Sequence, residues 1–256
     1  MKESTIKDIK YKLDTDQFSN AELELLREDK RKGVHKLLKQ YDVMQQRKKE
    51  LKKQYERMLS FEKKAKSSGK ILIAGIDEAG RGPLAGPVVA AAVILPPTFY
   101  LEGLYDSKQL SLQKREQFFE AIKQQADYGV GIVTNDEIDK WNIYQATKLA
   151  MRRAVNQLSE APDHLLIDAM RLENVPFTQE SIVKGDQRSV SIAAASIMAK
   201  VTRDRMMKEI SQHYPTYGFA SNQGYGTPMH LQALNTYGPT PYHRKSFAPV
   251  KDIIFS

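Results

Sequence analysis

Two apolar runs separated by a stretch rich in glycine and proline constrain the fold of this chain more than any other feature. The runs are ILIAGI at 71–76 and VVAAAVIL at 88–95, and Asp77 and Glu78 directly follow the first. Short apolar runs bounded by Gly and Pro are typical of strands, and this spacing predicts an antiparallel pair with a wide connection. Ionised carboxylates rarely lie beside a buried strand unless they are paired or bind something. The sequence therefore predicts a functional site where the first strand ends.

Two further carboxylates follow apolar or turn-like segments downstream. Asp168 closes the run HLLIDA at 164–169, and Asp186 lies in the tripeptide KGD. Taken singly, Asp168 could be a solvated strand end and Asp186 a turn or helix-capping residue. Four carboxylates brought together would repel one another unless a cation neutralised them. Oxygen-only ligands point to Mg²⁺ or Mn²⁺, and four of them suggest two ions acting together on a phosphoryl group.

The pattern from residue 70 onward predicts an α/β domain with a mixed sheet of about five strands flanked by helices. Besides the two runs above, further strands are expected at 128–134, 164–169 and 181–184. Helices are expected at 111–126, 143–159, 189–211 and 228–236. Residues 21–67 predict two or three helices, and the polar segment 65–70 predicts a linker. We therefore expect a basic helical extension over 1–69 and an α/β domain over 70–256 that ends in a helical segment.

Positive charge is concentrated in the N-terminal extension. Residues 1–69 hold 19 Lys and Arg against 12 Asp and Glu, within chain totals of 39 and 31. Clustered Lys and Arg suit a polyanion, because neutralised phosphates release counterions. A solvated, amphipathic helical arm explains the same residues equally well. The sequence leaves both interpretations open.

Composition excludes several classes of protein. The chain has no cysteine, which rules out disulfides, zinc–thiolate sites and thiol chemistry. No window approaches 18 uncharged apolar residues, so we expect no contact with a membrane. The N-terminus has no apolar signal segment, and together these features lead us to expect a cytoplasmic protein.

Two basic clusters near the C-terminal end have less certain roles. Arg203, Asp204 and Arg205 fall on the helix expected at 189–211, which favours a salt-bridged helix surface, with Asp204 as an alternative fifth acidic residue of the site. The run of His243, Arg244 and Lys245 predicts a basic patch that faces a duplex. No catalytic role is expected for His230 or His243.

Six motifs that occur in order give the chain a recognisable pattern. They are DEAGRGPLAGPV at 77–88, DSKQL at 106–110, LLIDAM at 165–170, KGD at 184–186, SIAAASIMAKVTRDR at 191–205 and GYGT at 224–227. Together they closely resemble the bacterial type 2 ribonucleases H (ribonuclease HII), from about residue 70 to 250. The basic extension looks like the one that some bacterial members carry, on a much weaker match.

This resemblance implies a metal-dependent endonuclease in which residues 70–256 form a ribonuclease H-like catalytic domain. It also implies that the C-terminal helical segment of this domain contacts substrate. Such an enzyme cleaves the RNA strand of RNA–DNA hybrids, including 5′ to single ribonucleotides embedded in duplex DNA, and leaves 5′-phosphate and 3′-hydroxyl ends. It implies Mg²⁺ or Mn²⁺ as cofactor, with two ions in the active complex. We expect a monomer whose partner is an RNA–DNA hybrid or DNA that contains ribonucleotides.

The resemblance also implies roles for individual residues. The four that match the acidic, metal-holding residues of the family are Asp77, Glu78, Asp168 and Asp186. Those that match its substrate-binding residues are Gly80, Arg81, Gly82, Ser107, Lys108 and Tyr225. The Gly-Arg-Gly backbone is expected to read the ribose 2′-hydroxyl, the tyrosine to pack on the neighbouring deoxyribose, and the Ser-Lys pair to contact phosphate. Glycine suits the first role because it permits close backbone approach, and the ribose hydroxyl both donates and accepts.

Two rival functions remain. One is another nuclease of the same fold, such as a type 3 ribonuclease H, which should ignore a single ribonucleotide. The other is a nucleic-acid-binding protein without catalysis, in which the carboxylates are merely structural and binding needs no metal.

Overall fold

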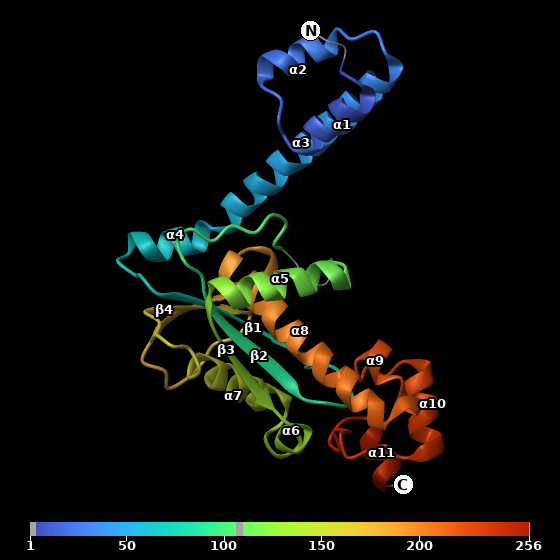
Figure 1. Ribbon diagram of the computed structural model, residues 1–256. Coiled ribbons are helices and arrows are strands. Elements are labelled where there is room, and N and C mark those ends of the chain that lie inside the picture. The colour runs from blue at the N-terminus through green and yellow to red at the C-terminus, as the bar shows by residue number, and fades with distance from the viewer. Residues whose placement is uncertain (1–3, 106–109, 256) are drawn as a thin grey trace. The chain divides into compact units, whose positions relative to one another are not determined.

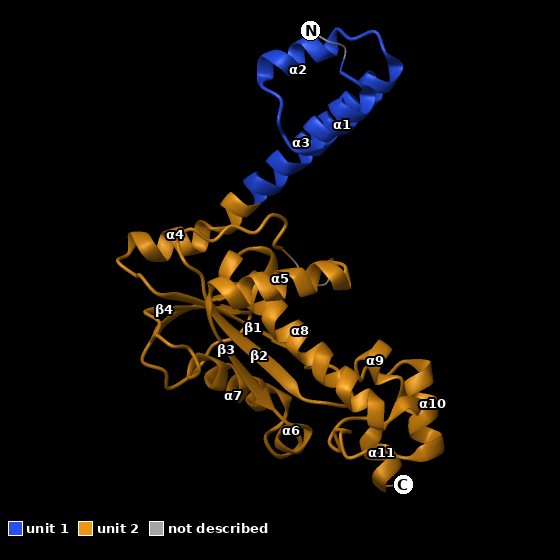
Figure 2. Ribbon diagram, viewed as in Figure 1, with its two compact units in different colours: residues 1–54 blue, residues 55–256 orange. Residues whose placement is uncertain are grey.

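The computed structural model describes residues 4–105 and 110–255, and the chain divides into two compact units, 1–54 and 55–256 (Figure 2). This division falls before the boundary expected at residue 69. The reason is that Tyr55 and Met58 are buried in the hydrophobic core of the second unit, where the Tyr55 hydroxyl donates to the Phe99 carbonyl at 2.6 Å. The helical segment that precedes the sheet therefore belongs in part to the larger unit.

The first unit is helical, as expected. It contains α1 (Ile6–Asp14), α2 (Asn20–Arg27) and most of α3 (Lys32–Met58), and α1 was not predicted. Thr5 and Ser19 start the first two helices with capping boxes, in which the side chain three residues later returns a hydrogen bond. A small buried cluster holds this unit together, formed by Ile9, Leu13, Val34 and Leu38.

Five strands of the second unit form one mixed sheet (Figure 1). They are β1 (Ile73–Ala79), β2 (Val88–Ile94), β3 (Asp127–Val133), β4 (His164–Asp168) and β5 (Thr178–Ile182), in the spatial order β3-β2-β1-β4-β5. The first three pair antiparallel, whereas β4 is parallel to both β1 and β5. The predicted fold class is confirmed, and the fifth strand lies slightly earlier than expected.

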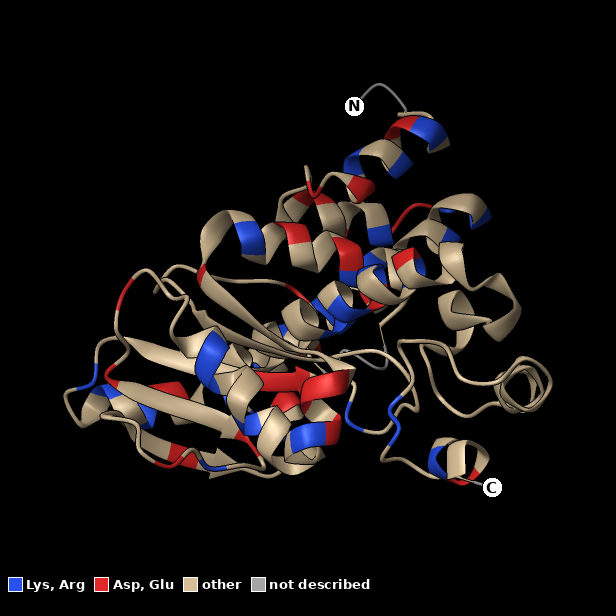
Figure 3. Ribbon diagram, turned by 90° about the horizontal axis from the view of Figure 1, so that it is seen from below, with Lys and Arg blue, Asp and Glu red and all other residues tan. Residues whose placement is uncertain are grey.

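Helices cover both faces of this sheet, and others lie beyond it near the end of α8. The helices that follow α3 are α4 (Ser60–Ser67), α5 (Leu112–Gln125), α6 (Asn135–Trp141), α7 (Ile143–Val155), α8 (Val190–His213), α9 (Phe219–Asn222), α10 (Pro228–Tyr237) and α11 (Val250–Phe255). Figure 1 shows α5 and α8 on one face and α7 on the other. Lys, Arg, Asp and Glu lie mainly on helices and loops, while the strands are largely uncharged (Figure 3). Across residues 4–105 and 110–255, every helix is too short or too polar to cross a bilayer.

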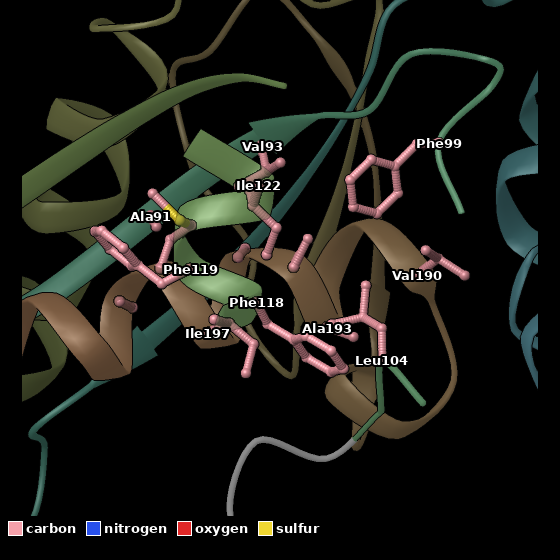
Figure 4. Packing of buried hydrophobic residues seen from close by; sticks show 14 of the residues in the cluster. Ala91, Val93, Phe99, Leu104, Phe118, Phe119, Ile122, Val190, Ala193 and Ile197 are labelled. Carbon is pink, nitrogen blue, oxygen red and sulfur yellow. The ribbon is translucent and has the colours of Figure 1, made fainter. Parts of the chain in front are cut away.

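Alternation along β2 divides the interior into two cores. Ala91 and Val93 pack toward α5 and α8, with Phe118 and Phe119 (Figure 4). The alternate residues of β2 point to the opposite face of the sheet and pack against α7. Successive strand side chains face opposite sides, so a strand covered on both faces is apolar throughout, which is why VVAAAVI carries no polar residue.

Glycine and small residues bring α8 unusually close to β1. A Cβ built at Gly75 would lie 2.0 Å from the Ser191 backbone carbon, so only glycine fits there. The start of α8 is correspondingly poor in bulky side chains, as the run SIAAAS shows. This close approach places the polar residues of α8 next to the end of β1.

Candidate active site

The end of the sheet gathers three of the four predicted carboxylates into one cleft. β1 and β4 are parallel neighbours in which Ile76 pairs with Ile167, so Asp77 and Asp168 follow at the same level. The cleft has a volume of about 310 Å³. Its lining consists of Asp77, Glu78, Ala79, Gly80, Arg81, Gly82, Asp168, Ser196, Lys200, Arg203 and Tyr225.

Asp77 is the most deeply buried carboxylate of the cleft, with 5% of its surface exposed. Burial raises the pKa of the Asp77 carboxyl well above its ordinary value, and the charges of Glu78 and Asp168 raise it further. Hydrogen bonds from Ser196 and from the Glu78 backbone N–H, at 2.7 Å, offset part of that shift. The Asp77 carboxyl thus holds its proton more tightly than an exposed aspartate does.

Asp186 lies beside this group but is not among the residues that line the cleft. It is buried, at 4% exposure, in the short 3₁₀ turn Gly185–Gln187. The backbone N–H of Gly185, next to it in the chain, donates to Asp168 Oδ1 at 2.7 Å. The turn that carries Asp186 is therefore attached directly to the end of β4.

The chemistry of these side chains fits a hard divalent cation. All are oxygen donors, and a bound cation would relieve the repulsion that raises the pKa of Asp77. Within the described ranges, no three acidic or histidine side chains are close enough together to form a ready-made metal shell. Carboxylates that repel one another are expected to stay apart when no cation lies between them. The types of donor present in the cleft therefore fit a divalent cation.

Gly82 and Tyr225 line one side of the cleft, next to the carboxylates. A Cβ built at Gly82 would have Cε1 of the Tyr225 ring, at 3.4 Å, as its nearest neighbour outside its own stretch of chain. Tyr225 is 49% exposed. We call the part of the cleft that these two residues line the Gly82–Tyr225 slot. Arg81 is exposed, and its Nη1 forms an ion pair with Glu78 Oε1 at 3.1 Å.

Ser107 and Lys108, the expected phosphate-contacting pair, lie outside the described residues.

Two arginines behind the slot are buried, contrary to the sequence-based interpretation of each. Arg203 was expected on a salt-bridged surface and Arg244 in a patch facing a duplex, yet they are 1% and 0% exposed. All of their hydrogen bonds in the structure go to backbone carbonyls. Burial lowers the pKa of both guanidinium groups, although arginine keeps its charge near neutral pH. Their fork of donors suits several carbonyls at once, which explains why they can be buried without a carboxylate partner.

Arg203 joins the two loops that form the slot. Its Nε donates to Pro87 O at 2.9 Å and its Nη2 to Ala85 O at 3.1 Å, both in the connection between β1 and β2. Its Nη1 donates to Gln223 O at 3.0 Å, in the loop before Tyr225. The neighbouring Asp204 pairs with Lys200 at 2.7 Å, so the salt-bridge interpretation is confirmed for that residue.

Two buried histidines form a hydrogen-bonded chain that ends at Tyr225. The Thr240 N–H donates to Nδ1 of His243 at 2.8 Å, so the proton of the neutral ring lies on Nε2. That Nε2 lies 2.9 Å from Nε2 of His230, whose Nδ1 donates to Tyr225 O at 2.9 Å. Burial and the neighbouring His230 lower the pKa of His243 to about 4, which keeps the ring neutral at ordinary pH.

Sequence reasoning missed several residues of the cleft. Ser196, Lys200 and Arg203 are spaced four and three residues apart on α8, so they share one helix face. Polar residues at that spacing in an otherwise apolar helix were a usable signal. The sequence contains no corresponding signal for Arg244, whose partners lie far away in the chain.

A mixed sheet in the order β3-β2-β1-β4-β5, with acidic side chains at the ends of its adjacent central strands, defines a ribonuclease H-like nuclease. A solved structure, the ribonuclease H2 from Pyrococcus horikoshii OT3, is similar with a TM-score of 0.62 and 29% identity, covering 72% of this chain and 97% of that one. The family model for ribonuclease HII matches residues 74–250, and the model for the ribonuclease HII N-terminal domain matches residues 5–66. The chain belongs to the ribonuclease HII family.

Curated relatives extend the similarity along nearly the whole chain. Ribonuclease HII of Geobacillus kaustophilus is 51% identical over 255 residues, 99% of this chain and 98% of that protein. Ribonuclease HII of Bacillus cereus strain B4264 is 58% identical over 233 residues, 90% of each chain. The chain is therefore a ribonuclease H, a metal-dependent hydrolase.

Proposed function

We propose that this enzyme cuts the RNA strand of RNA–DNA hybrids and also cuts 5′ to a single ribonucleotide embedded in duplex DNA. The observation that carries the proposal is the Gly82–Tyr225 slot beside the buried carboxylates. A ribose on the glycine side can approach the backbone closely, and an aromatic face on the other side suits a sugar that lacks the 2′-hydroxyl. A junction between one ribose and the deoxyribose next to it fits both sides at once.

Asp77, Glu78, Asp168 and Asp186 are the residues proposed to hold the metal. Two Mg²⁺ or Mn²⁺ ions bound there would activate a water molecule and stabilise the leaving 3′-oxygen of an in-line displacement, giving 5′-phosphate and 3′-hydroxyl ends. Ser196 orients Asp77 through its hydrogen bond. The walls of the slot hold the sugar next to these carboxylates, so that the scissile phosphate is positioned before the reaction. Ser107 and Lys108 are proposed to contact a phosphate near the cut.

Three duplexes of identical sequence test the proposal. One is all DNA, one carries a single ribonucleotide, and one has a continuous RNA strand. We expect cleavage of the second and third with Mg²⁺ or Mn²⁺, no cleavage of the first, and none of any with chelator. Cleavage of the hybrid alone would instead indicate type 3 specificity. Binding that persists in chelator with no cleavage under any condition would indicate a binding protein. The monomeric state and the cytoplasmic location expected from the sequence stay predictions.

A further inference from the structure

The two walls of the Gly82–Tyr225 slot come from separate loops. Gly82 lies in the connection between β1 and β2, and Tyr225 lies in the loop between α9 and α10. Neither wall is part of a helix or a central strand, so the width of the slot depends on what fixes the two loops. The loops are joined to each other by the Leu84 N–H, which donates to Gly224 O at 2.8 Å, and by Arg203. Each loop is also held from one dipeptide near the C-terminus, His243 and Arg244.

Arg244 holds the glycine wall. Its Nη2 donates to Gly80 O at 2.5 Å and its Nη1 to Arg81 O at 2.9 Å. Its Nε donates to Gly86 O at 3.0 Å, near the far end of the same connection. One planar group thus fixes the start and the end of the loop that presents Gly82.

The main chain of the same segment reinforces this attachment. The backbone N–H of Arg244 donates to Leu84 O at 2.8 Å, and Gly86 N–H donates to Tyr242 O at 2.8 Å. These two bonds flank an antiparallel bridge between Ala85 and His243. The C-terminal segment therefore pairs with the connection as a short strand would.

His243 holds the tyrosine wall through His230. The chain of hydrogen bonds from Thr240 through both imidazoles ends on the carbonyl of Tyr225. Both rings are fully buried and lie against the rings of Tyr217 and Phe219, which leaves them little freedom to move. The backbone position of Tyr225 is thereby linked to the segment that also carries Arg244.

We propose that His243 and Arg244 are positioning residues that together fix the width of the Gly82–Tyr225 slot and so determine the preference for a ribose–deoxyribose junction. This rests on the proposed function, because it assumes that the slot holds such a junction. A continuous RNA strand places no deoxyribose against Tyr225, so its cleavage depends less on the distance between the two walls.

Two conservative substitutions separate this role from simple support of the fold. His243→Asn keeps a side-chain acceptor near the Thr240 N–H but is too short to reach His230. Arg244→Lys keeps the charge but replaces a planar fork by a single ammonium, which cannot bond Gly80, Arg81 and Gly86 together. Arg205→Lys is the matched control: this half-exposed arginine pairs with Glu116 and Glu120 on α5, away from the slot.

The measurement is kcat/KM on the single-ribonucleotide duplex divided by kcat/KM on the continuous hybrid, with the folded fraction of each variant followed by circular dichroism. For His243→Asn and Arg244→Lys we expect this ratio to fall by about tenfold or more, since misplacement by roughly 1 Å can cost about a hundredfold in rate. Arg205→Lys should keep the wild-type ratio. A purely structural role lowers both activities in step with the folded fraction and leaves the ratio unchanged. An unchanged ratio in both variants overturns the proposal. A failure of both variants to fold overturns it as well.

The wild-type enzyme distinguishes failure of this inference from failure of the proposed function. If wild type does not cut the single-ribonucleotide duplex, the proposed function is wrong. If it does and the two variants keep its ratio, only the positioning role is wrong.

Discussion

Arg203 occupies the space beside Gly80 that any side chain at that position would need. A Cβ built at Gly80 would lie 2.0 Å from Arg203 Nε and 2.5 Å from its Cδ, and the φ angle of Gly80 is +94°. Gly82 differs in both respects, since its φ is not left-handed and its Cβ would meet only the Tyr225 ring, at 3.4 Å. The fold itself requires the first glycine of the Gly-Arg-Gly motif. Folding does not require the second, so we expect that substrate binding does.

Alanine at each glycine should therefore have opposite effects. Gly80→Ala should destabilise the second unit by at least about 1–3 kcal/mol, because it adds both backbone strain and a clash with Arg203. Gly82→Ala should change the free energy of unfolding by less than about 1 kcal/mol, yet lower kcat/KM by about a hundredfold because its methyl group prevents the close approach of a sugar to the backbone. Urea denaturation and single-ribonucleotide cleavage measure the two effects. A fully active Gly82→Ala enzyme would show that no sugar enters the slot.

Asp77→Asn should abolish cleavage while stabilising the metal-free protein. The folded-state pKa of Asp77 is raised, so the folded protein holds this proton more tightly than the unfolded chain does. Ionisation of the Asp77 carboxyl therefore lowers the free energy of unfolding, which falls as pH rises above the ordinary carboxyl pKa. Asparagine does not ionise, so the variant avoids this loss. We expect kcat to fall by at least about 10²–10³-fold.

Thermal unfolding with added Mn²⁺ checks the same variant. Mn²⁺ should raise the Tm of wild type, because a ligand that binds only the folded state stabilises it, and should raise that of Asp77→Asn much less. Glu209→Gln, an exposed change on α8, is the control and should respond as wild type does. Equal shifts in all three proteins would exclude Asp77 as a metal ligand.

His243 should make the enzyme lose stability in mild acid. Its folded-state pKa is lowered to about 4 from an ordinary 6.5, so between these values the unfolded chain binds a proton that the folded protein does not. The stabilisation is complete above pH 6.5 and is lost as pH falls toward 4, by on the order of 3 kcal/mol. Urea denaturation from pH 4 to 8 should show this decline in wild type and a shallower one in His243→Asn. His213→Asn, at an exposed position, should follow wild type, and the same slope in all three would contradict the assignment.

Truncation at residue 54 should be tolerated better than truncation at residue 69. Tyr55 and Met58 lie in the main core, and Glu62 Oε1 accepts from Ser189 Oγ at 2.6 Å and from Ser191 N at 3.0 Å, at the start of α8. Loss of two large core residues and a helix cap costs several kcal/mol, on the order of 5. Thermal melts of chains 55–256 and 70–256 should therefore differ by about 10 °C or more. Equal melting temperatures would mean that residues 55–69 do not stabilise the second unit and that its boundary lies at 69.

The periodicity of the chain was enough to predict the sheet and most of its helices. β1 to β4 were expected near their observed places, because each contains a short apolar run, whereas β5 has the polar sequence TQESI and overlaps the expected strand at 181–184 only in its last two residues. Ser111 and Ser189 cap α5 and α8, and both lie at the first residue of the helix range expected from the sequence. The short helices α6, α9 and α11 were missed, since too few turns are present for a periodic pattern. Gln223 has a left-handed backbone conformation, with φ of 53°. Periodicity does not predict a tight loop of this kind either.

The cleft was predictable where motifs carry it and unpredictable where long-range contacts do. Asp77 and Asp168 could be expected to meet because each lies near the end of a strand. The sequence did not predict that β1 and β4 are parallel neighbours, which is what brings the two residues together. Arg203 and Arg244 look like ordinary surface cations in sequence. Their burial depends on carbonyls that only the folded connection turns toward them, and no local pattern encodes that arrangement.

The bridge between Ala85 and His243 joins two segments that are far apart in the chain. Closing a loop of that length costs conformational entropy, which the contacts of the docked C-terminal segment must offset. The sheet that carries Asp77 and Asp168 is built without that segment, so partial unfolding can release the sugar-contacting loops while the carboxylates stay in place.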